Sequence, residues 1–184
     1  AADSRAEAIA LSAGGGGITA TVAVLSTSTA TQAQVASGTR LRSAGELEID
    51  ALRSSSATVN AIGAGAGVLG GTGIVVGIGV SRADVFAEVG SDAVLGDNVA
   101  QPSLIRVRAR NTGAIESKGI AAAGGVFGAD TATQVLAEEK GTTRAGVGER
   151  TTARSAGRLT VQADDRVRVA ADAIGVQVGG GISY

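Results

Sequence analysis

The sequence predicts an all-β protein of repeated units, with a thin core of glycine and alanine between its sheets. Three observations lead to this fold class. One strand pattern recurs with its parts in constant order, glycine and alanine fill about a third of the 184 positions, and proline occurs once. A recurring unit of this kind is typical of solenoids, in which each unit packs mainly against its neighbours. We therefore expect a β-solenoid that resembles a β-helix.

The predicted unit begins with a short alternating strand. In three segments, 47–51, 105–109 and 159–163, apolar residues occupy every odd position and polar residues lie between them. This period of two indicates a strand with one buried face. The segments recur at a nearly constant spacing, and the first interval is slightly longer than the second. After each segment we expect a polar corner, then a strand with alternating alanine, and then a cluster of glycines. The predicted corners are at 53–56, 111–113 and 164–165.

The linkers between these strands also repeat. The tripeptide Ser-Ala-Gly lies at 43–45 and at 155–157, shortly before the first and the third strand. The middle copy has four more residues, around Asp97, Asn98 and Pro102, which account for the difference between the two intervals. Insertions that gather in one loop while the strands keep their order are typical of solenoid repeats. We predict a single array over 1–184, with approximate units 1–46 (partial), 47–104, 105–158 and 159–184 (partial).

The glycine clusters predict sheets that lie close together. A face of glycine and alanine permits a spacing that leucine or phenylalanine would prevent. Stacked sheets have an open edge at each end, so we also expect self-association end to end or continuation into further repeats. We expect most of the apolar burial to come from larger side chains, which are Val22, Val24, Val75, Val76, Ile78, Val80, Val135 and Leu136.

The segment 61–80 allows an alternative, a membrane-spanning helix with a glycine packing face. It carries no charge, and several pairs of its glycines lie four positions apart. Its eight glycines disfavour a helix, because each costs about 1 kcal/mol of helix propensity. The equivalent stretches of other units contain charged residues such as Glu116, Lys118 and Asp172. A glycine-zipper protein that associates with membranes or forms pores is therefore the alternative, and we expect no membrane insertion.

The missing residue types exclude most enzyme classes. The chain has no His, Cys, Met or Trp, so thiol nucleophiles, Ser-His-Asp triads, disulfides and the usual zinc sites are impossible. We expect no enzyme activity, no catalytic residue and no cofactor. A net charge of −1 does not favour a nucleic-acid partner. A chain without Cys or Met has little that oxidises, which favours a location outside the cell. Its start, Ala1-Ala2-Asp3, indicates a mature product or a fragment.

Arginine alternates along two predicted strands, and such a row can form a basic stripe for DNA, polysaccharide or lipopolysaccharide. Two positions of this row, Arg106 and Arg108, are occupied by Glu48 and Asp50 one unit earlier. Opposite charges at equivalent positions favour pairing between units, and we prefer this structural role. The arginines of the row are Arg106, Arg108, Arg110, Arg166 and Arg168.

A calcium site is a further interpretation of the loops. Asp92, Asp97 and Asn98 share one glycine-containing loop, and the segment 124–130 resembles part of a calcium-binding nonapeptide turn. Such a turn needs a repeated pattern that this chain does not complete once. We therefore predict no metal site.

Two patterns suggest a ligand-binding surface or a lyase. Asp164, Asp165 and Arg166 are the densest catalytic candidate, but neighbouring residues of a strand point to opposite faces. Clustered threonines suggest an ice-binding ladder, but they do not recur at a fixed spacing, and we expect them on outer strand faces. These threonines are Thr19, Thr21, Thr27, Thr29, Thr31, Thr131 and Thr133.

The order of these parts resembles the shafts of large secreted filamentous adhesins, and of haemagglutinin-like or leukotoxin-like surface proteins, of Gram-negative bacteria. The resemblance rests on the alternating strand at 47–51, the run at 57–62, the glycine-rich centre and the Val-Ala-Val strand at 22–24. It implies a β-solenoid shaft at the cell surface, without catalytic residues, that holds a distal binding domain away from the cell. The expected function is a structural stalk or fibre segment, with any host or cell-surface ligand bound by a part outside this chain. A carbohydrate-binding or ice-binding β-solenoid module is a further alternative.

Overall fold

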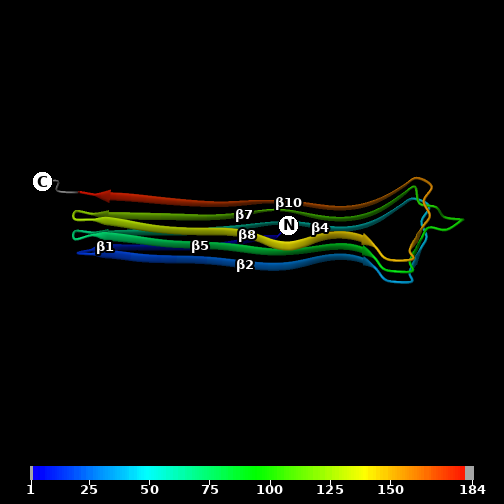
Figure 1. The fold of residues 1–184 in the computed structure, drawn as a ribbon, viewed down its shortest axis with the longest axis horizontal. Coiled ribbons are helices and arrows are strands. Elements are labelled where there is room, and N and C mark those ends of the chain that lie inside the picture. The colour runs from blue at the N-terminus through cyan, green and yellow to red at the C-terminus, as the bar shows by residue number, and fades with distance from the viewer. Residues whose placement is uncertain (1, 181–184) are drawn as a thin grey trace.

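The chain folds into parallel β-sheets, with no helix in the part that the structure describes. The computed structural model describes residues 2–180. Two long sheets face each other and a small sheet lies at one end (Figure 1). The prediction of an all-β protein is confirmed. Sheet A contains β1 (Ala2–Gly14), β4 (Glu46–Gly67), β7 (Leu104–Gly125) and β10 (Arg158–Gly179); sheet B contains β2 (Gly17–Val35), β5 (Gly71–Val89) and β8 (Ala129–Val147); sheet C contains β3 (Arg40–Leu41), β6 (Val94–Leu95) and β9 (Thr152–Ala153).

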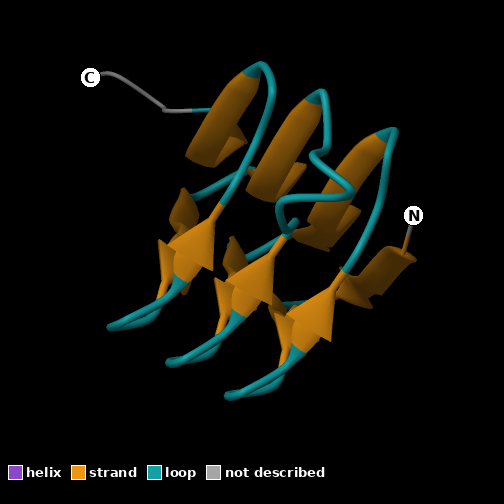
Figure 2. Ribbon diagram, turned by 90° about the vertical axis from the view of Figure 1, so that its right-hand side faces the viewer, coloured by secondary structure: helices purple, strands orange, loops and turns teal. Residues whose placement is uncertain are grey.

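Each unit of the chain follows the same path. A strand of sheet A leads through a short turn, at 15–16, 68–70 or 126–128, into a strand of sheet B that runs back. A short strand of sheet C and a loop then return the chain to sheet A, one position further along the sheet (Figure 2). The result is an elongated slab with a turn end and a corner end.

The three predicted alternating strands lie side by side in sheet A. Leu47 pairs with Ile105, and Ile105 pairs with Leu159, so the register offsets equal the two intervals of the sequence pattern. The four extra residues lie in the loop 96–103, whereas the equivalent loops 42–45 and 154–157 are shorter. The prediction of these alternating strands is confirmed, and so is the position of the insertion.

The predicted polar corners are wrong. The segments 53–56, 111–113 and 164–165 lie within β4, β7 and β10, each of which is one continuous strand of 22 residues. Polar residues interrupt the apolar pattern there because they form a polar layer inside the slab, which is described below. The real corners lie between the strands of sheet B and sheet A. Gly38, Asp92 and Arg150 occupy equivalent corner positions, and all three have a positive φ of 71, 59 and 56°.

The core lies between the two long sheets and has two parts. Near the corner end, Ile49, Val85 and Val107 belong to a buried cluster of larger apolar side chains. Nearer the turn end, Val59 and Val75 pack among alanines. Most inner positions of the strands there are glycine, alanine, serine or threonine, and a Cβ added at Gly65 or Gly71 would lie only 2.4 Å from a backbone oxygen of the opposite sheet, so the two sheets lie close together at the turn end.

Several predicted core residues are not in the core. Val75 is fully buried, as predicted, but Val22, Val24 and Leu136 are 60, 57 and 46% exposed. These three occupy outward positions of β2 and β8, because the inward face is the one that carries the small residues. The prediction of their burial is therefore wrong. The other members of the predicted set are half-buried, and they are Val76, Ile78, Val80 and Val135.

Close approach of the sheets explains the glycines of the turn end. A Cβ at Gly73 would lie 2.6 Å from the carbonyl oxygen of Ala122, across the slab. A Cβ at Gly119 would lie 2.7 Å from a methyl carbon of Val135. Real Cβ contacts are longer than this, so the prediction that glycine permits the narrow spacing is confirmed.

The segment 61–80 forms the end of β4, the turn 68–70 and the first half of β5. It is therefore not the helix of the alternative interpretation. Within residues 2–180, no helix is long and apolar enough to cross a membrane.

Candidate functional site

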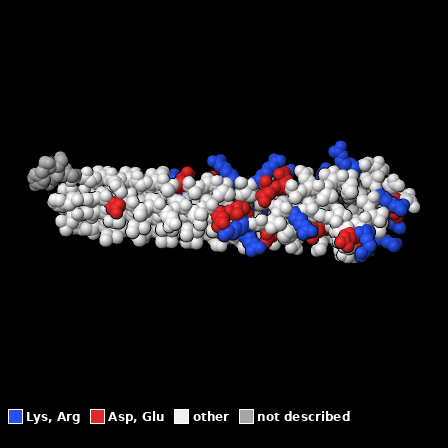
Figure 3. All heavy atoms as spheres, viewed as in Figure 1, with Lys and Arg blue, Asp and Glu red and all other residues white. Residues whose placement is uncertain are grey.

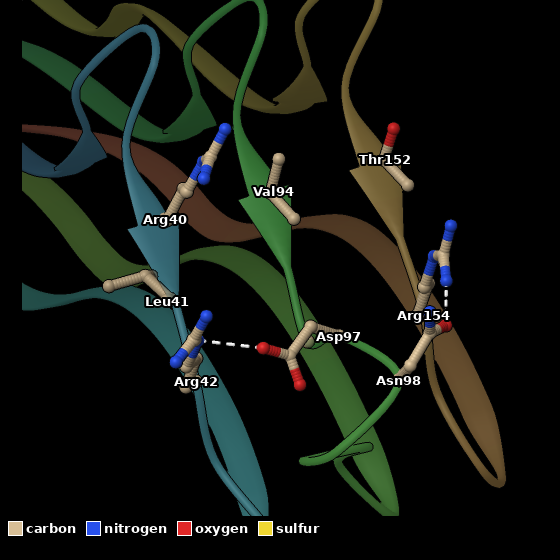
Figure 4. A pocket seen from close by; sticks show the side chains of 9 residues that line it. Arg40, Leu41, Arg42, Val94, Asp97, Asn98, Thr152 and Arg154 are labelled. Atoms are coloured by element: carbon tan, nitrogen blue, oxygen red, sulfur yellow. Dashed lines mark hydrogen bonds and ion pairs between the residues drawn. The ribbon is translucent and has the colours of Figure 1, made fainter.

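A cleft of about 300 Å³ lies at the corner end, where the three strands of sheet C run side by side. Arg42, Gly96 and Arg154 follow these strands at equivalent positions, and Arg40 lies two residues earlier (Figure 4). Gly96 has a φ of 79°, a left-handed conformation that favours glycine. It starts the inserted loop, which carries Asp97 into the space between the two outer arginines.

The inserted loop neutralises part of the positive charge in this cleft, because it brings one carboxylate, Asp97, to the three guanidiniums of Arg40, Arg42 and Arg154. The carboxylate of Asp97 accepts hydrogen bonds of 2.8 Å from the N–H groups of Val99 and Ala100, and it lies 2.7 Å from Nε of Arg42. The backbone hydrogen bonds, assisted by the arginines, hold the pKa of Asp97 below its usual range. Arg154 donates to the amide oxygen of Asn98. An Asp that is held ionised in this way is a poor general base, so the cleft is suited to organising the corner rather than to proton transfer.

The arginine row of sheet A is paired with acids from neighbouring units. Arg106 pairs with Glu48, and Nη2 of Arg108 lies 2.7 Å from Oδ2 of Asp50. Both pairs join β7 to β4 at equivalent register positions. The predicted pairing between units is thus confirmed. Because the charges of the row are compensated, its central part does not present an open basic stripe.

The remaining arginines of the row surround one carboxylate or point to solvent. Asp164 lies 3.3 Å from Arg110 and 3.0 Å from Arg166, on the outer face of sheet A. Arg168 is exposed on the same strand, β10. Asp165 points the opposite way, into the slab, where it accepts hydrogen bonds from Asn111 and Thr143. The structure therefore separates the two carboxylates of the lyase interpretation, as the alternation of a strand requires.

The acidic residues of the calcium interpretation have other partners. Asp92 accepts hydrogen bonds of 2.6 and 2.8 Å from the guanidinium of Arg150, which lies one unit further along the chain. This pairing lowers the pKa of Asp92. Asp97 lies beyond β6 and is engaged as described above, and Asp130 is exposed at the start of β8. Within the described part of the chain, no three acidic side chains gather as a metal site would need.

The predicted threonine surface is wrong, because all seven threonines of the set occupy inward positions of their strands. Thr19 and Thr21 point into the slab and are 5% and 4% exposed. Their hydroxyls donate to the carbonyl oxygens of Thr72 and Ile62. Threonine fits the narrow interior because it is small and its hydroxyl finds a backbone acceptor there. The other threonines of the set, Thr27, Thr29, Thr31, Thr131 and Thr133, share the inward phase of their strands.

A polar layer crosses the interior and was not predicted from the sequence. Arg53, Asn111 and Asp165 occupy one register position of sheet A and point inward. Nη1 of Arg53 donates to Asn111 over 3.0 Å, and Nδ2 of Asn111 donates to Asp165 over 3.2 Å. Ser81 and Glu139 belong to one register position of sheet B and face this row. Burial raises the pKa of Glu139, against the hydrogen bond from Ser81 and the charge of Arg53. The polar interruptions of the apolar pattern were its signal in the sequence.

Comparisons of the chain with family models, curated proteins and solved structures found no match. Function is therefore inferred from the geometry of this chain.

Proposed function

We propose that the chain is a segment of a parallel β-solenoid that serves as a stalk or fibre element of an exported bacterial surface adhesin. The support for this proposal lies in the way the units repeat. Strands of successive units pair in register over their whole length, both between β4 and β7 and between β7 and β10. A unit of this kind can be added repeatedly without a change of design, which is how a shaft gains length.

The main support for further units is the exposed apolar inner face of β10. Leu159 and Val161 point inward but are 49% and 46% exposed. Their register partners one unit earlier, Ile105 and Val107, are fully buried. The difference arises because sheet A has four strands and sheet B has three, so β10 lacks a strand of sheet B at its outer side. A following strand in that place would bury the same apolar side chains.

A lengthened chain tests the solenoid. In this variant the segment 126–179 is repeated after Gly179, which adds one unit. We expect its thermal midpoint to rise by at least about 4 °C, because half-exposed apolar side chains worth about 1 kcal/mol each become buried. Equal midpoints for the two lengths, measured by circular dichroism, would contradict coupling between units.

A matched pair of substitutions shows whether the gain comes from the proposed contact. Val161→Lys points into the slab and is tolerated in the original chain, where the side chain reaches solvent, but it should remove most of the gain in the lengthened chain. Gln162→Lys lies on the outer face of the same strand and should leave the gain intact. A similar effect of both substitutions would mean that the new unit does not pack on β10.

The role as a surface stalk needs a separate experiment in the natural source. Antibodies against the chain should label thin surface fibres on intact cells in electron micrographs. A strand of 22 residues predicts a fibre width of about 70 Å, and each unit adds about 4.8 Å of length. Labelling that appears only after the cells are broken would reject the surface stalk, and it would leave the solenoid test unaffected.

A further inference from the structure

The cleft at the corner end keeps a positive charge that is compensated elsewhere in the chain. Charged side chains gather toward this end of the slab (Figure 3), and most described arginines pair with an acid. Of the three arginines that line the cleft, only Arg42 forms an ion pair within residues 2–180. Arg154 donates to the neutral amide of Asn98, and Arg40 has no acid beside it in this part of the chain. Among the nine lining residues, all of them described, Asp97 is the only acid, so three guanidiniums and one carboxylate leave two positive charges.

The arginines surround a position of sheet C that has no side chain. Gly96 follows β6 at the position between Arg42 and Arg154. Neighbouring strands lie about 4.8 Å apart, so the backbones of these two arginines are about 10 Å apart. Figure 4 shows Arg40 and Arg42 on one side of β6 and Arg154 on the other. Because glycine leaves the middle position open, the guanidiniums border a space of about 300 Å³.

Asp97 enters this space with one of its two carboxylate oxygens. Oδ1 accepts the hydrogen bonds from the N–H groups of Val99 and Ala100, which hold the inserted loop. Oδ2 is directed to the other side and lies 2.7 Å from Nε of Arg42. An anionic oxygen of the chain itself thus already occupies one place between the arginines, while Arg40 and Arg154 keep their charges uncompensated.

We propose that this cleft binds a phosphate group as a dianion, either as free phosphate or as the monoester of a small molecule. Guanidiniums bind phosphate oxygens through strong, charge-assisted hydrogen bonds. A phosphate monoester carries close to two negative charges at neutral pH, which equals the uncompensated charge of the cleft. A carboxylate, a sulfate ester or a phosphodiester carries one charge and compensates only half of it. The proposal does not depend on the proposed function, because all three arginines belong to this chain.

Nuclear magnetic resonance of the isotope-labelled chain tests the site, with inorganic phosphate and methyl phosphate as probes. At about pH 8 and low ionic strength, each probe should shift the amide signals of residues 96–100 to saturation, with a Kd of about 1 mM or lower. Methyl sulfate has almost the same shape and one charge less, so it should bind at least about fivefold more weakly. A lower Kd for methyl phosphate than for inorganic phosphate supports an ester as the ligand, and the reverse order supports the free ion.

Substitutions show which charges act on the ligand. Arg40→Gln and Arg154→Gln should each weaken the binding of methyl phosphate at least about fivefold. Arg168→Gln is the matched control, because Arg168 is exposed on β10 outside the cleft, and it should leave the Kd unchanged. Asp97→Asn should strengthen binding at least about fivefold. Its amide oxygen can keep the two hydrogen bonds of Oδ1, whereas the competing charge of Oδ2 is removed.

Several outcomes would overturn the proposal. They are a lack of saturable binding of both phosphate probes, equal affinities for methyl phosphate and methyl sulfate, and a loss of affinity in Arg168→Gln as large as in Arg40→Gln. Weaker binding by Asp97→Asn at an unchanged thermal midpoint would also contradict it. If Asp97→Asn disturbs the loop, Arg40→Gln still decides, because Arg40 has no ion pair in the described part of the chain that its replacement could break.

Discussion

Replacement of Gly73 by alanine tests the closeness of the two sheets. The added Cβ would lie 2.6 Å from the carbonyl oxygen of Ala122, and 3.4 and 3.5 Å from the carbonyl carbon and the nitrogen of the same residue. All three are backbone atoms, so no side-chain rotation relieves the contact. To reach an ordinary separation, β5 and β7 must move apart by a large fraction of an ångström, against the ladders that hold both strands.

The expected size of the effect follows from two opposing contributions. Alanine in place of glycine in a strand favours folding by about 0.5–1 kcal/mol, because the unfolded chain loses freedom. Overpacking of a close interior costs about 1–3 kcal/mol. We expect Gly73→Ala to lower the free energy of unfolding by about 1–2 kcal/mol, or the thermal midpoint by about 2–6 °C.

The control is Gly124→Ala, in the same thin part of the slab. A Cβ at Gly124 would meet nothing closer than the carbonyl oxygen of Val178 at 3.9 Å. This substitution keeps the favourable contribution without the overpacking, so its midpoint should stay the same or rise. Thermal unfolding followed by circular dichroism measures both variants. If Gly73→Ala is as stable as Gly124→Ala, the sheets are not held as close as we argue.

Three further predictions concern the charged side chains. Asp50→Arg places two like charges together and should lower the free energy of unfolding by more than about 1 kcal/mol. The double variant that also carries Arg108→Asp restores opposite charges and should regain most of this loss. A double variant no more stable than the single one would refute the cross-unit pair. Glu139 has a raised pKa, so its ionisation destabilises the fold as pH rises from the usual glutamate range. Glu139→Gln should raise the thermal midpoint at neutral pH and flatten the decline of the midpoint with pH, and an unchanged pH dependence would contradict this role of Glu139. Asp92 has a lowered pKa, so its pairing with Arg150 stabilises the fold above the usual aspartate pKa. This stabilisation is lost as pH falls through the lowered pKa, so Asp92→Asn should lose less stability in acid than the original chain does. Equal acid unfolding of the two proteins would count against the pair.

The alternating strands could be predicted from the sequence, because a period of two residues and a nearly constant interval between units define them. Leu47, Ile105 and Leu159 share a register position, and alternation of apolar and polar residues was sufficient to align them. The length of the strands could not be predicted in this way. The polar residues Arg53 and Asn111 look like the end of a strand. A single sequence does not distinguish a polar residue that has a polar partner in the interior from one that faces water.

The inward face of the turn end was misassigned for a related reason. Hydrophobicity alone places Val22 and Val24 inside and Thr19 and Thr21 outside, and the structure has the reverse. Where two sheets lie close together, volume limits the inner face more strongly than hydrophobicity does. The larger side chains, such as Val22 and Val24, are therefore displaced to the outer face. The charge pairs between units, by contrast, could be predicted, since equivalent positions carry opposite signs.

The polar layer gives this slab its register. Near the turn end, strand segments of alanine and glycine look almost the same after a shift of two residues, so they specify the pairing weakly. The outer charges do not correct such a shift, because Asp50 would then move from Arg108 to Arg110 and keep an opposite charge. The interior is less tolerant, because the same shift would move Arg53 from Asn111 to Gly113 and leave its half-buried guanidinium without its acceptor. A buried polar group that loses its partner costs about 1–3 kcal/mol, more when it is charged. The layer that interrupts the apolar core is thus the feature that selects one register for the long strands on either side of it.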